Sequence, residues 1–211
     1  MQRDLRGDEA LNFLLVGDLV GVAVFAASGA SAAIGKRLDL FGVAFVGFVA
    51  ALGGGILRDL VIGAVPPLAF ADWRYAITAV LASIAVFRLH PHLTRLRRTV
   101  LVLDAAGLGL FTVTGTLKAL TTGVPPVGAC LVGMLTAIGG GLARDLLTAE
   151  IPVVLQRDIY AIVALGGAIL VTILHGIGFV SALPMTGAAV LMTGLRLLAL
   201  RRRWSAPVAL P

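Results

Sequence analysis

The chain has 211 residues, of which 59% are hydrophobic and 13% charged, and its mean hydropathy is +1.01. Because a soluble domain usually has about 25% charged residues, this composition excludes a soluble globular protein and predicts a single helical membrane domain over residues 1–211. The net charge of +6 would suggest nucleic-acid binding in a soluble protein, but here the cations gather in short loops and at the C-terminus, so we expect no nucleic-acid partner.

Apolar runs long enough to span a bilayer follow one another along the chain. They predict an all-α integral membrane fold with seven transmembrane helices. The third run is short and begins with Trp73, Arg74 and Tyr75, which we expect to anchor it at the membrane interface. The predicted spans cover residues 11–34, 40–63, 72–89, 99–120, 126–149, 158–175 and 179–200.

The second and fifth spans each contain a glycine triplet, Gly53-Gly54-Gly55 and Gly139-Gly140-Gly141. A glycine inside a helix costs about 1 kcal/mol relative to alanine, so each triplet costs about 3 kcal/mol. Backbone that is loosened at membrane depth is tolerated where it is buried in protein or lines a water-filled cavity. We therefore predict that helices two and five are kinked at the triplets and flank a functional pathway. The alternative is that the glycines only allow close helix packing.

An arginine and an aspartate follow each triplet, as Arg58-Asp59 and as Arg144-Asp145. Charged side chains at bilayer depth are costly unless they are paired or hydrated. Neighbouring residues on a helix point about 100° apart, so we expect that Arg58 and Asp59 cannot neutralise each other and that partners come from elsewhere. A structural arginine–aspartate clamp and a role in conduction both remain open. The carboxylates available to the two arginines are Asp18, Asp59, Asp104 and Asp145.

Sliding the chain over itself by 86 residues superposes the two triplets without a gap. Composition bias can match glycine or alanine, but not aspartate, arginine and proline in register, so the chain contains an internal repeat. The first copy covers residues 11–89 and the second 99–175, with the seventh helix, 179–200, outside the repeat. Each copy has three helices, so the second enters the membrane from the opposite side and the repeat is inverted. Other matched pairs are Asp18 with Asp104, Phe25 with Phe111, Ser28 with Thr114, Arg58 with Arg144, Asp59 with Asp145 and Pro66 with Pro152.

Lysine and arginine are unevenly divided between the two sides of the predicted fold. Eleven lie on the side of the C-terminus and four on the other, and the remaining two are Arg58 and Arg144. The positive-inside rule then places the N-terminus outside and the C-terminus in the cytoplasm, in a multi-pass protein of the plasma (inner) membrane. The eleven are Lys36, Arg37, Arg88, Arg95, Arg97, Arg98, Arg157, Arg196, Arg201, Arg202 and Arg203.

Three further polar side chains within the spans have two interpretations each. Ser28 and Thr114 either hydrogen-bond carbonyls that the kinks would free, or take part in ordinary interhelical packing. Lys118, near the end of the fourth span, either extends its amine to the interface or contributes a charge beside the pathway. Its repeat partner is Ala32, so Lys118 breaks the symmetry of the repeat.

The doubled Gly-Gly-Gly-x-x-Arg-Asp motif, followed each time by proline seven residues later within an inverted repeat, resembles the prokaryotic branch of the trimeric intracellular cation channels. The resemblance covers about residues 11–200. It implies a homotrimer in which each subunit holds its own pore, flanked by the glycine kinks of helices two and five, and conduction of monovalent cations, chiefly potassium. A lysine on helix four is linked to voltage dependence in animal members, and Lys118 would correspond to it. The phosphoinositide-binding Lys-Glu-Val signature of animal members is absent, so lipid regulation of that kind is not implied.

Two functions stay open from the residues themselves. One is a passive channel for potassium or sodium, in which carbonyls freed at the kinks replace part of the hydration shell of the ion. The other is a secondary transporter of a small zwitterion such as glycine, whose carboxylate would bind at a half-helix N-terminus. An enzyme is not expected, because no Ser-His-Asp set, metal cluster or phosphate loop stands within the spans. We expect no cofactor and no metal site, and as partners only further copies of the chain, membrane lipid and the permeant ion.

Overall fold

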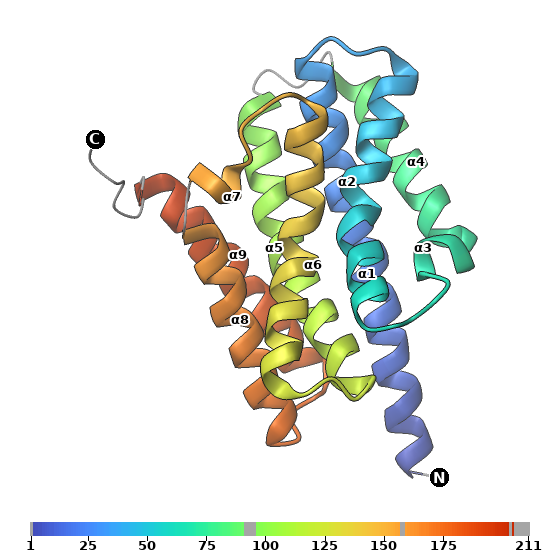
Figure 1. Cartoon of the computed structure of the whole chain (residues 1–211), viewed down its shortest axis with the longest axis vertical. Helices are drawn as coiled ribbons and strands as arrows, with labels where there is room; N and C mark the ends of the chain where they lie inside the picture. The colour runs from blue at the N-terminus through green and yellow to red at the C-terminus, as the bar shows by residue number, and fades with distance from the viewer. Residues whose placement is uncertain (1, 91–95, 157–158, 203, 205–211) are drawn as a thin grey trace.

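The computed structural model describes the backbone of residues 2–90, 96–156, 159–202 and 204, and the side chains of residues 15–90, 96–155, 159–202 and 204 (Figure 1). Every described element is helical, which confirms the all-α prediction. Two of the helices, α3 (Leu68–Ala71) and α7 (Val153–Gln156), are single turns that the sequence analysis did not predict. The seven long helices are α1 (Gln2–Gly35), α2 (Leu40–Val61), α4 (Trp73–Leu89), α5 (Leu96–Thr121), α6 (Pro126–Leu147), α8 (Ile159–Gly176) and α9 (Ala182–Arg202).

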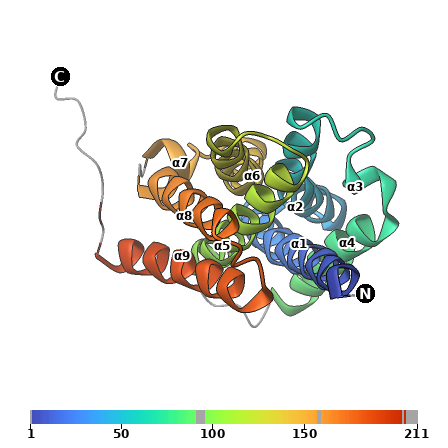
Figure 2. The same cartoon turned by 90° about the horizontal axis from the view of Figure 1, so that it is seen from below.

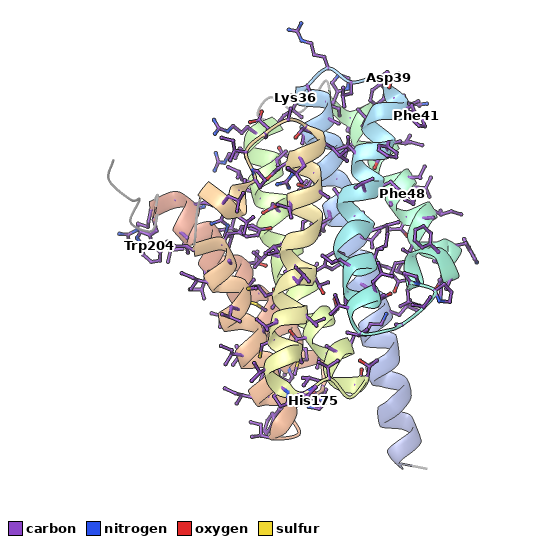
Figure 3. All side chains as sticks on the ribbon, in the orientation of Figure 1. Lys36, Asp39, Phe41, Phe48, His175 and Trp204 are labelled. Carbon is purple, nitrogen blue, oxygen red and sulfur yellow. The ribbon has the colours of Figure 1, made fainter. Side chains whose placement is uncertain are left out.

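Six of the long helices are long and apolar enough to cross a membrane. The seventh, α4, has 17 residues, which is at the lower end of the length that spans a bilayer. Large apolar side chains such as Phe41 and Leu183 are exposed on the outside of the bundle, and Phe41 points away from it in Figure 3. The protein is therefore a multi-pass membrane protein. Three residues named above, Arg95, Arg157 and Arg203, lie outside the described residues, as does position 158, the start of the sixth predicted span.

Successive long helices run in alternating directions through one bundle (Figure 1). Seen along the helices, α1, α2, α5 and α6 occupy the middle, with α3 and α4 on one flank and α8 and α9 on the other (Figure 2). The two halves of the chain meet where α1 packs on α5 and α2 packs on α6. Lys36 and Asp39 lie at one end of the bundle and His175 at the opposite end (Figure 3).

Local signals explain where the repeat helices begin and end. Asp39 caps α2, since its carboxylate accepts a hydrogen bond from the backbone N–H of Gly42 at 2.8 Å. Helix α2 stops just before Gly63, whose φ of +74° is the left-handed conformation that ends many helices. Ala149 takes the same role after α6 with φ of +52°, at the position equivalent to Gly63 in the repeat.

The two glycine triplets lie where α2 and α6 cross. A Cβ atom at position 54 would lie 2.2 Å from the carbonyl oxygen of Thr136, and one at position 140 would lie 2.2 Å from the carbonyl oxygen of Ala50. Glycine is therefore required at both positions by backbone-to-backbone contact, as the close-packing interpretation stated. Both helices are α-helical through the triplets, and the kinks stay a prediction.

The gap-free alignment of the two repeats is wrong beyond the loops that follow α2 and α6. The amide of Ala64 donates to the carbonyl of Asp59, and the amide of Glu150 donates to that of Asp145. These equivalent bonds of the two repeats are 86 residues apart. The amide of Phe70 donates to the carbonyl of Pro67, and the amide of Leu155 donates to that of Pro152. These next equivalent bonds are only 85 residues apart. The second loop is thus one residue shorter. Pro152 corresponds to Pro67 instead of Pro66, and Tyr160 corresponds to Tyr75.

The crossing predicts opposite effects of alanine at two neighbouring glycines. Gly54→Ala should destabilise the fold by about 1–3 kcal/mol, because its methyl group meets a backbone carbonyl that cannot move aside. Gly53→Ala is the matched control, since its Cβ would meet nothing closer than 3.7 Å and alanine favours the helix. Thermal unfolding in mild detergent measures both variants. Equal midpoints for the two would contradict the close contact.

Candidate functional site

Two clusters of buried charged and polar side chains stand at opposite ends of the bundle. We call them the Arg58 cluster and the Arg144 cluster after the arginines near the C-terminal ends of α2 and α6, which run in opposite directions (Figure 1). The Arg58 cluster consists of Asp18, Arg58, Asp59, Tyr75 and Lys118. The Arg144 cluster consists of Ser28, Asp104, Arg144, Asp145 and Tyr160.

Arg58 is 2% exposed and contacts two carboxylates. Its Nη1 donates to Asp18 Oδ2 on α1 at 3.2 Å, and its Nε donates to Asp59 Oδ1 at 2.8 Å. The prediction that a carboxylate neutralises this arginine is confirmed. The expectation that Arg58 cannot pair with Asp59 is wrong, because the long arginine side chain folds back until its Nε reaches the adjacent carboxylate.

Asp59 connects the Arg58 cluster to two further elements. Its Oδ2 accepts a hydrogen bond from the backbone N–H of Leu68, the first residue of α3, at 2.9 Å. Its Oδ1 also accepts from Lys118 Nζ on α5, at 2.7 Å, so the lysine amine is held by a buried carboxylate. The Tyr75 hydroxyl on α4 donates to Asp18 Oδ2 at 3.4 Å. Five helices thus meet at one charge cluster.

The Arg144 cluster repeats this pattern with different additions. Arg144 Nε donates to Asp145 Oδ1 at 2.8 Å, and its Nη1 donates to Asp104 Oδ1 on α5 at 2.7 Å. Asp145 Oδ2 accepts from the backbone N–H of Val153, the first residue of α7, at 2.9 Å. Where the Arg58 cluster has a lysine, this cluster has Ser28 on α1, whose Oγ accepts from Arg144 Nη1 at 2.7 Å.

The structure separates the two hydroxyls that the repeat aligns. Ser28 belongs to the Arg144 cluster, and its hydroxyl also lies 3.4 Å from the Val100 carbonyl of α5. Thr114 is buried but its Oγ1 has no hydrogen-bond partner among the described residues, and its methyl group packs against Gly17. Neither hydroxyl is seen to bond a carbonyl of the triplets, and because the kinks stay a prediction, the choice between the two interpretations stays open.

Three residues of these sites were missed or misplaced by the sequence analysis. Tyr75 is 5% exposed and points into the bundle, whereas its neighbour Trp73 is 71% exposed, as expected of an interfacial residue. Tyr160 is 2% exposed and was not singled out, because the one-residue difference between the loops aligns it with Arg74 when no gap is allowed. Arg196 was counted as a cytoplasmic cation, but it is 1% exposed and its guanidinium lies 4.8 Å from the centre of the Tyr160 ring.

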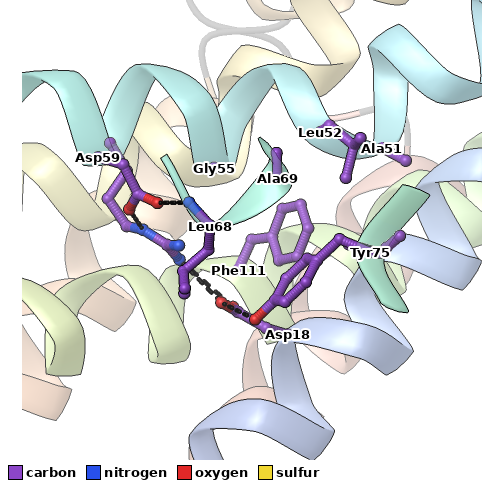
Figure 4. Close-up of a pocket in the computed structure, with 11 residues that line it drawn as sticks. Asp18, Ala51, Leu52, Gly55, Asp59, Leu68, Ala69, Tyr75 and Phe111 are labelled. Atoms are coloured by element: carbon purple, nitrogen blue, oxygen red, sulfur yellow. Dashed lines mark hydrogen bonds and ion pairs between the residues drawn. The ribbon is translucent and has the colours of Figure 1, made fainter. Parts of the chain in front are cut away.

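A pocket opens beside the Arg58 cluster, between α1, α2, α3, α4 and α5 (Figure 4). The close-up shows the Asp18 carboxylate and the Tyr75 hydroxyl on one wall and the Asp59 carboxylate bonded to Leu68 on another. The remaining lining is mostly apolar and includes the ring of Phe111. Arg58 also lines the pocket and contacts both carboxylates, and Lys118 bonds to Asp59, so the two negative charges of the site face two positive ones.

Comparison with known sequences gives one family. The sequence model described as "Glycine transporter" matches the chain twice, over residues 15–91 and 101–176. A UPF0126 membrane protein of Deinococcus radiodurans is 41% identical over 198 residues, which cover 93% of this chain and 90% of the relative. The UPF0126 inner membrane protein YadS of Escherichia coli K12 is 39% identical over 153 residues, which cover 72% of this chain and 74% of the relative.

Solved structures give the same picture. The TRIC trimeric intracellular cation channel orthologue from Rhodobacter sphaeroides superposes with a TM-score of 0.87 at 34% identity, covering 90% of this chain and 98% of that one. A prokaryotic TRIC channel crystallised in 0.5 M KCl superposes with a TM-score of 0.84 at 28% identity, covering 92% and 98% of the two chains. The fold described above is therefore that of these channels.

The burial of Arg144 predicts a large cost for its removal. Arg144→Gln leaves the carboxylates of Asp104 and Asp145 buried without a cation, and we expect a loss of about 3–5 kcal/mol of stability. Arg74→Gln is the control, because Arg74 pairs with Asp72 at the surface and its loss should leave the unfolding midpoint unchanged. Thermal unfolding of both variants in detergent is the measurement. A midpoint for Arg144→Gln that matches Arg74→Gln would show that the buried pair is dispensable.

Proposed function

The chain belongs to the family of the trimeric intracellular cation channels, and we propose that it conducts monovalent cations, chiefly potassium, along a separate path in each subunit. Membership of this family makes the protein a cation channel and not an enzyme. The potassium preference and the course of the path are the parts proposed here.

The observation that carries the proposal is the pair of buried arginine–aspartate clusters at the two ends of one bundle. Ionisable side chains inside a membrane protein are expensive and mark ion pathways or structural clamps. The Arg58 cluster places two carboxylates, Asp18 and Asp59, beside a pocket together with the arginine that pairs with both, and we take this pocket as one mouth of the path. The Arg144 cluster is its equivalent at the other end. We place the path between the two repeats, with one cluster near each mouth.

The narrowest part of the proposed path lies at the crossing of α2 and α6. Thr136 and Ala50 direct their carbonyl oxygens toward Gly54 and Gly140, so each helix presents backbone dipoles to the other. Kinking at the triplets Gly53-Gly54-Gly55 and Gly139-Gly140-Gly141 would free such carbonyls to replace part of the hydration shell of a passing ion. The permeant ion is the only small partner that the proposal needs, and no cofactor is involved.

We also propose the assembly and the orientation. The protein forms a homotrimer in the inner membrane with its N-terminus outside, and native mass spectrometry that shows a stable monomer or dimer would refute the trimer. Removing the buried Arg196 from the cation count leaves ten on the C-terminal side against four, so the charge bias keeps its direction. Cysteines introduced at Arg37, just after α1, and at Thr122, just after α5, lie at opposite ends of the bundle. A membrane-impermeant label should reach Arg37→Cys from the cytoplasm and Thr122→Cys from outside.

Ion flux decides the proposed function. Purified protein in liposomes under a potassium gradient should carry potassium current with single-channel steps, and Gly54→Leu/Gly140→Leu should abolish it by forcing bulk into the crossing. Gly166→Leu on α8 is the control, because a side chain there meets no neighbour within 4 Å. Currents that persist in the double-leucine protein would remove the triplets from the path. Saturable glycine uptake without single-channel steps would instead make the protein a transporter.

The contact of Lys118 with Asp59 predicts a change in voltage response. A membrane potential acts on one charge by up to about 2.3 kcal/mol per 100 mV, and Lys118 is a cation within a predicted span. Lys118→Ala should therefore alter the open probability or its voltage dependence, while Arg58 still neutralises Asp59. Lys36→Ala removes a lysine at the end of α1, where its pairing with Glu150 is exposed, and should leave the voltage dependence unchanged. Planar-bilayer recordings compare the two, and identical curves for Lys118→Ala and the unmodified protein would exclude a gating role.

A further inference from the structure

Two buried aromatic rings, one from each repeat, stack against each other inside the bundle, and their contact has no part in the function described so far. Phe25 on α1 and Phe111 on α5 occupy equivalent positions of the two repeats. They are 0% and 2% exposed, and their ring centroids lie 5.0 Å apart with planes inclined by 29°. We call this pair the Phe25–Phe111 stack.

Each ring is seated against a glycine of the opposite helix. A Cβ atom at position 21 would lie 2.3 Å from the ring of Phe111, and one at position 107 would lie 2.6 Å from the ring of Phe25. The two contacts are related by the repeat. At each of them, the absent side chain of a glycine leaves room for the phenylalanine ring of the other helix. Since both spaces are already filled, neither ring can move closer to the opposite helix.

The stack lies between the two charged clusters. On one side, the ring of Phe111 lines the pocket together with Asp18 and Asp59 (Figure 4). On the other side, the ring of Phe25 covers Gly107, one helical turn from Asp104 of the Arg144 cluster. Phe25 Cδ1 also lies 3.6 Å from the Cβ position of Gly140, so the stack borders the crossing of α2 and α6.

A cation that moved from one cluster to the other would therefore meet two stacked apolar rings. The rings have no polar atom to replace the water that the ion would lose, and apolar constrictions close ion paths by excluding water. We propose that the Phe25–Phe111 stack is the closed barrier of the path, and that conduction requires the two rings to separate. This inference rests on the proposed function, because it assumes that the path joins the two clusters.

Silver ions test the barrier without any measurement of current. Silver is a monovalent cation close to potassium in size and reacts with thiols. Cys130→Ala removes the native cysteine, and Ala51→Cys then places one thiol on the wall of the pocket. In sealed proteoliposomes of known orientation, we expect silver to react from the side of the Arg58 cluster only. In Phe25→Ala/Phe111→Ala the same thiol should react from both sides.

Phe48→Ala is the matched control, because Phe48 on α2 is a partly buried phenylalanine of the same core and is neither of the two stacked rings. The thiol should stay accessible from one side in that variant. Phe25→Leu/Phe111→Leu keeps the site apolar if the double-alanine protein fails to fold, and should react from the far side faster than the unmodified stack. Reaction from both sides with both rings present, or from one side with both rings removed, would overturn the barrier. Absence of potassium current in the unmodified and the double-alanine protein, with silver still reaching the thiol from both sides once both rings are removed, would refute the proposed potassium conduction and leave the barrier standing.

Discussion

The buried pairing of Arg58 and Arg144 with carboxylates is the constraint on which the rest of the structure depends. A guanidinium removed from water is stable only with partners that satisfy both its charge and its hydrogen bonds. Each arginine therefore fixes an aspartate of its own helix and one of a second helix, Asp18 or Asp104. The same-helix aspartates in turn hold the first amides of α3 and α7, so the loops outside the long helices are tied to the charges within.

The two clusters share an arginine paired with two aspartates, and they differ in the further side chains that contact them. Lys118 adds a second cation to the Arg58 cluster by donating to Asp59, and its repeat partner Ala32 provides none. The Arg144 cluster has the neutral hydroxyl of Ser28, which accepts from Arg144. Helix α9, which lies outside the repeat, places Arg196 over Tyr160. The proposed path therefore has unlike ends, and any response to voltage or ion concentration should depend on direction.

Hydropathy and the doubled motif predicted the helices, the repeat and the carboxylate partners, because long apolar runs and buried charges leave few alternatives. The pairing of Arg58 with Asp59 was not predictable from helix geometry alone, since it depends on how a flexible side chain folds back on its own backbone. The burial of Arg196 could not be predicted from the sequence either. Position near a helix end fits both a basic anchor and a core residue, and only the packing of α9 on α5 and α8 decides between them.

The one-residue difference between the two loops bears on how such a protein diverges after duplication. Tyr75 and Tyr160 hold equivalent places beside Asp18 and Asp104, although the loop before α7 is one residue shorter than the loop before α3 and shifts them out of sequence register. The two copies thus keep a tyrosine hydroxyl at the same place in the fold, although the two tyrosines are 85 and not 86 residues apart in the sequence. An ancestry traced by ungapped alignment would pair Tyr160 with Arg74 and overstate how far the two halves have separated.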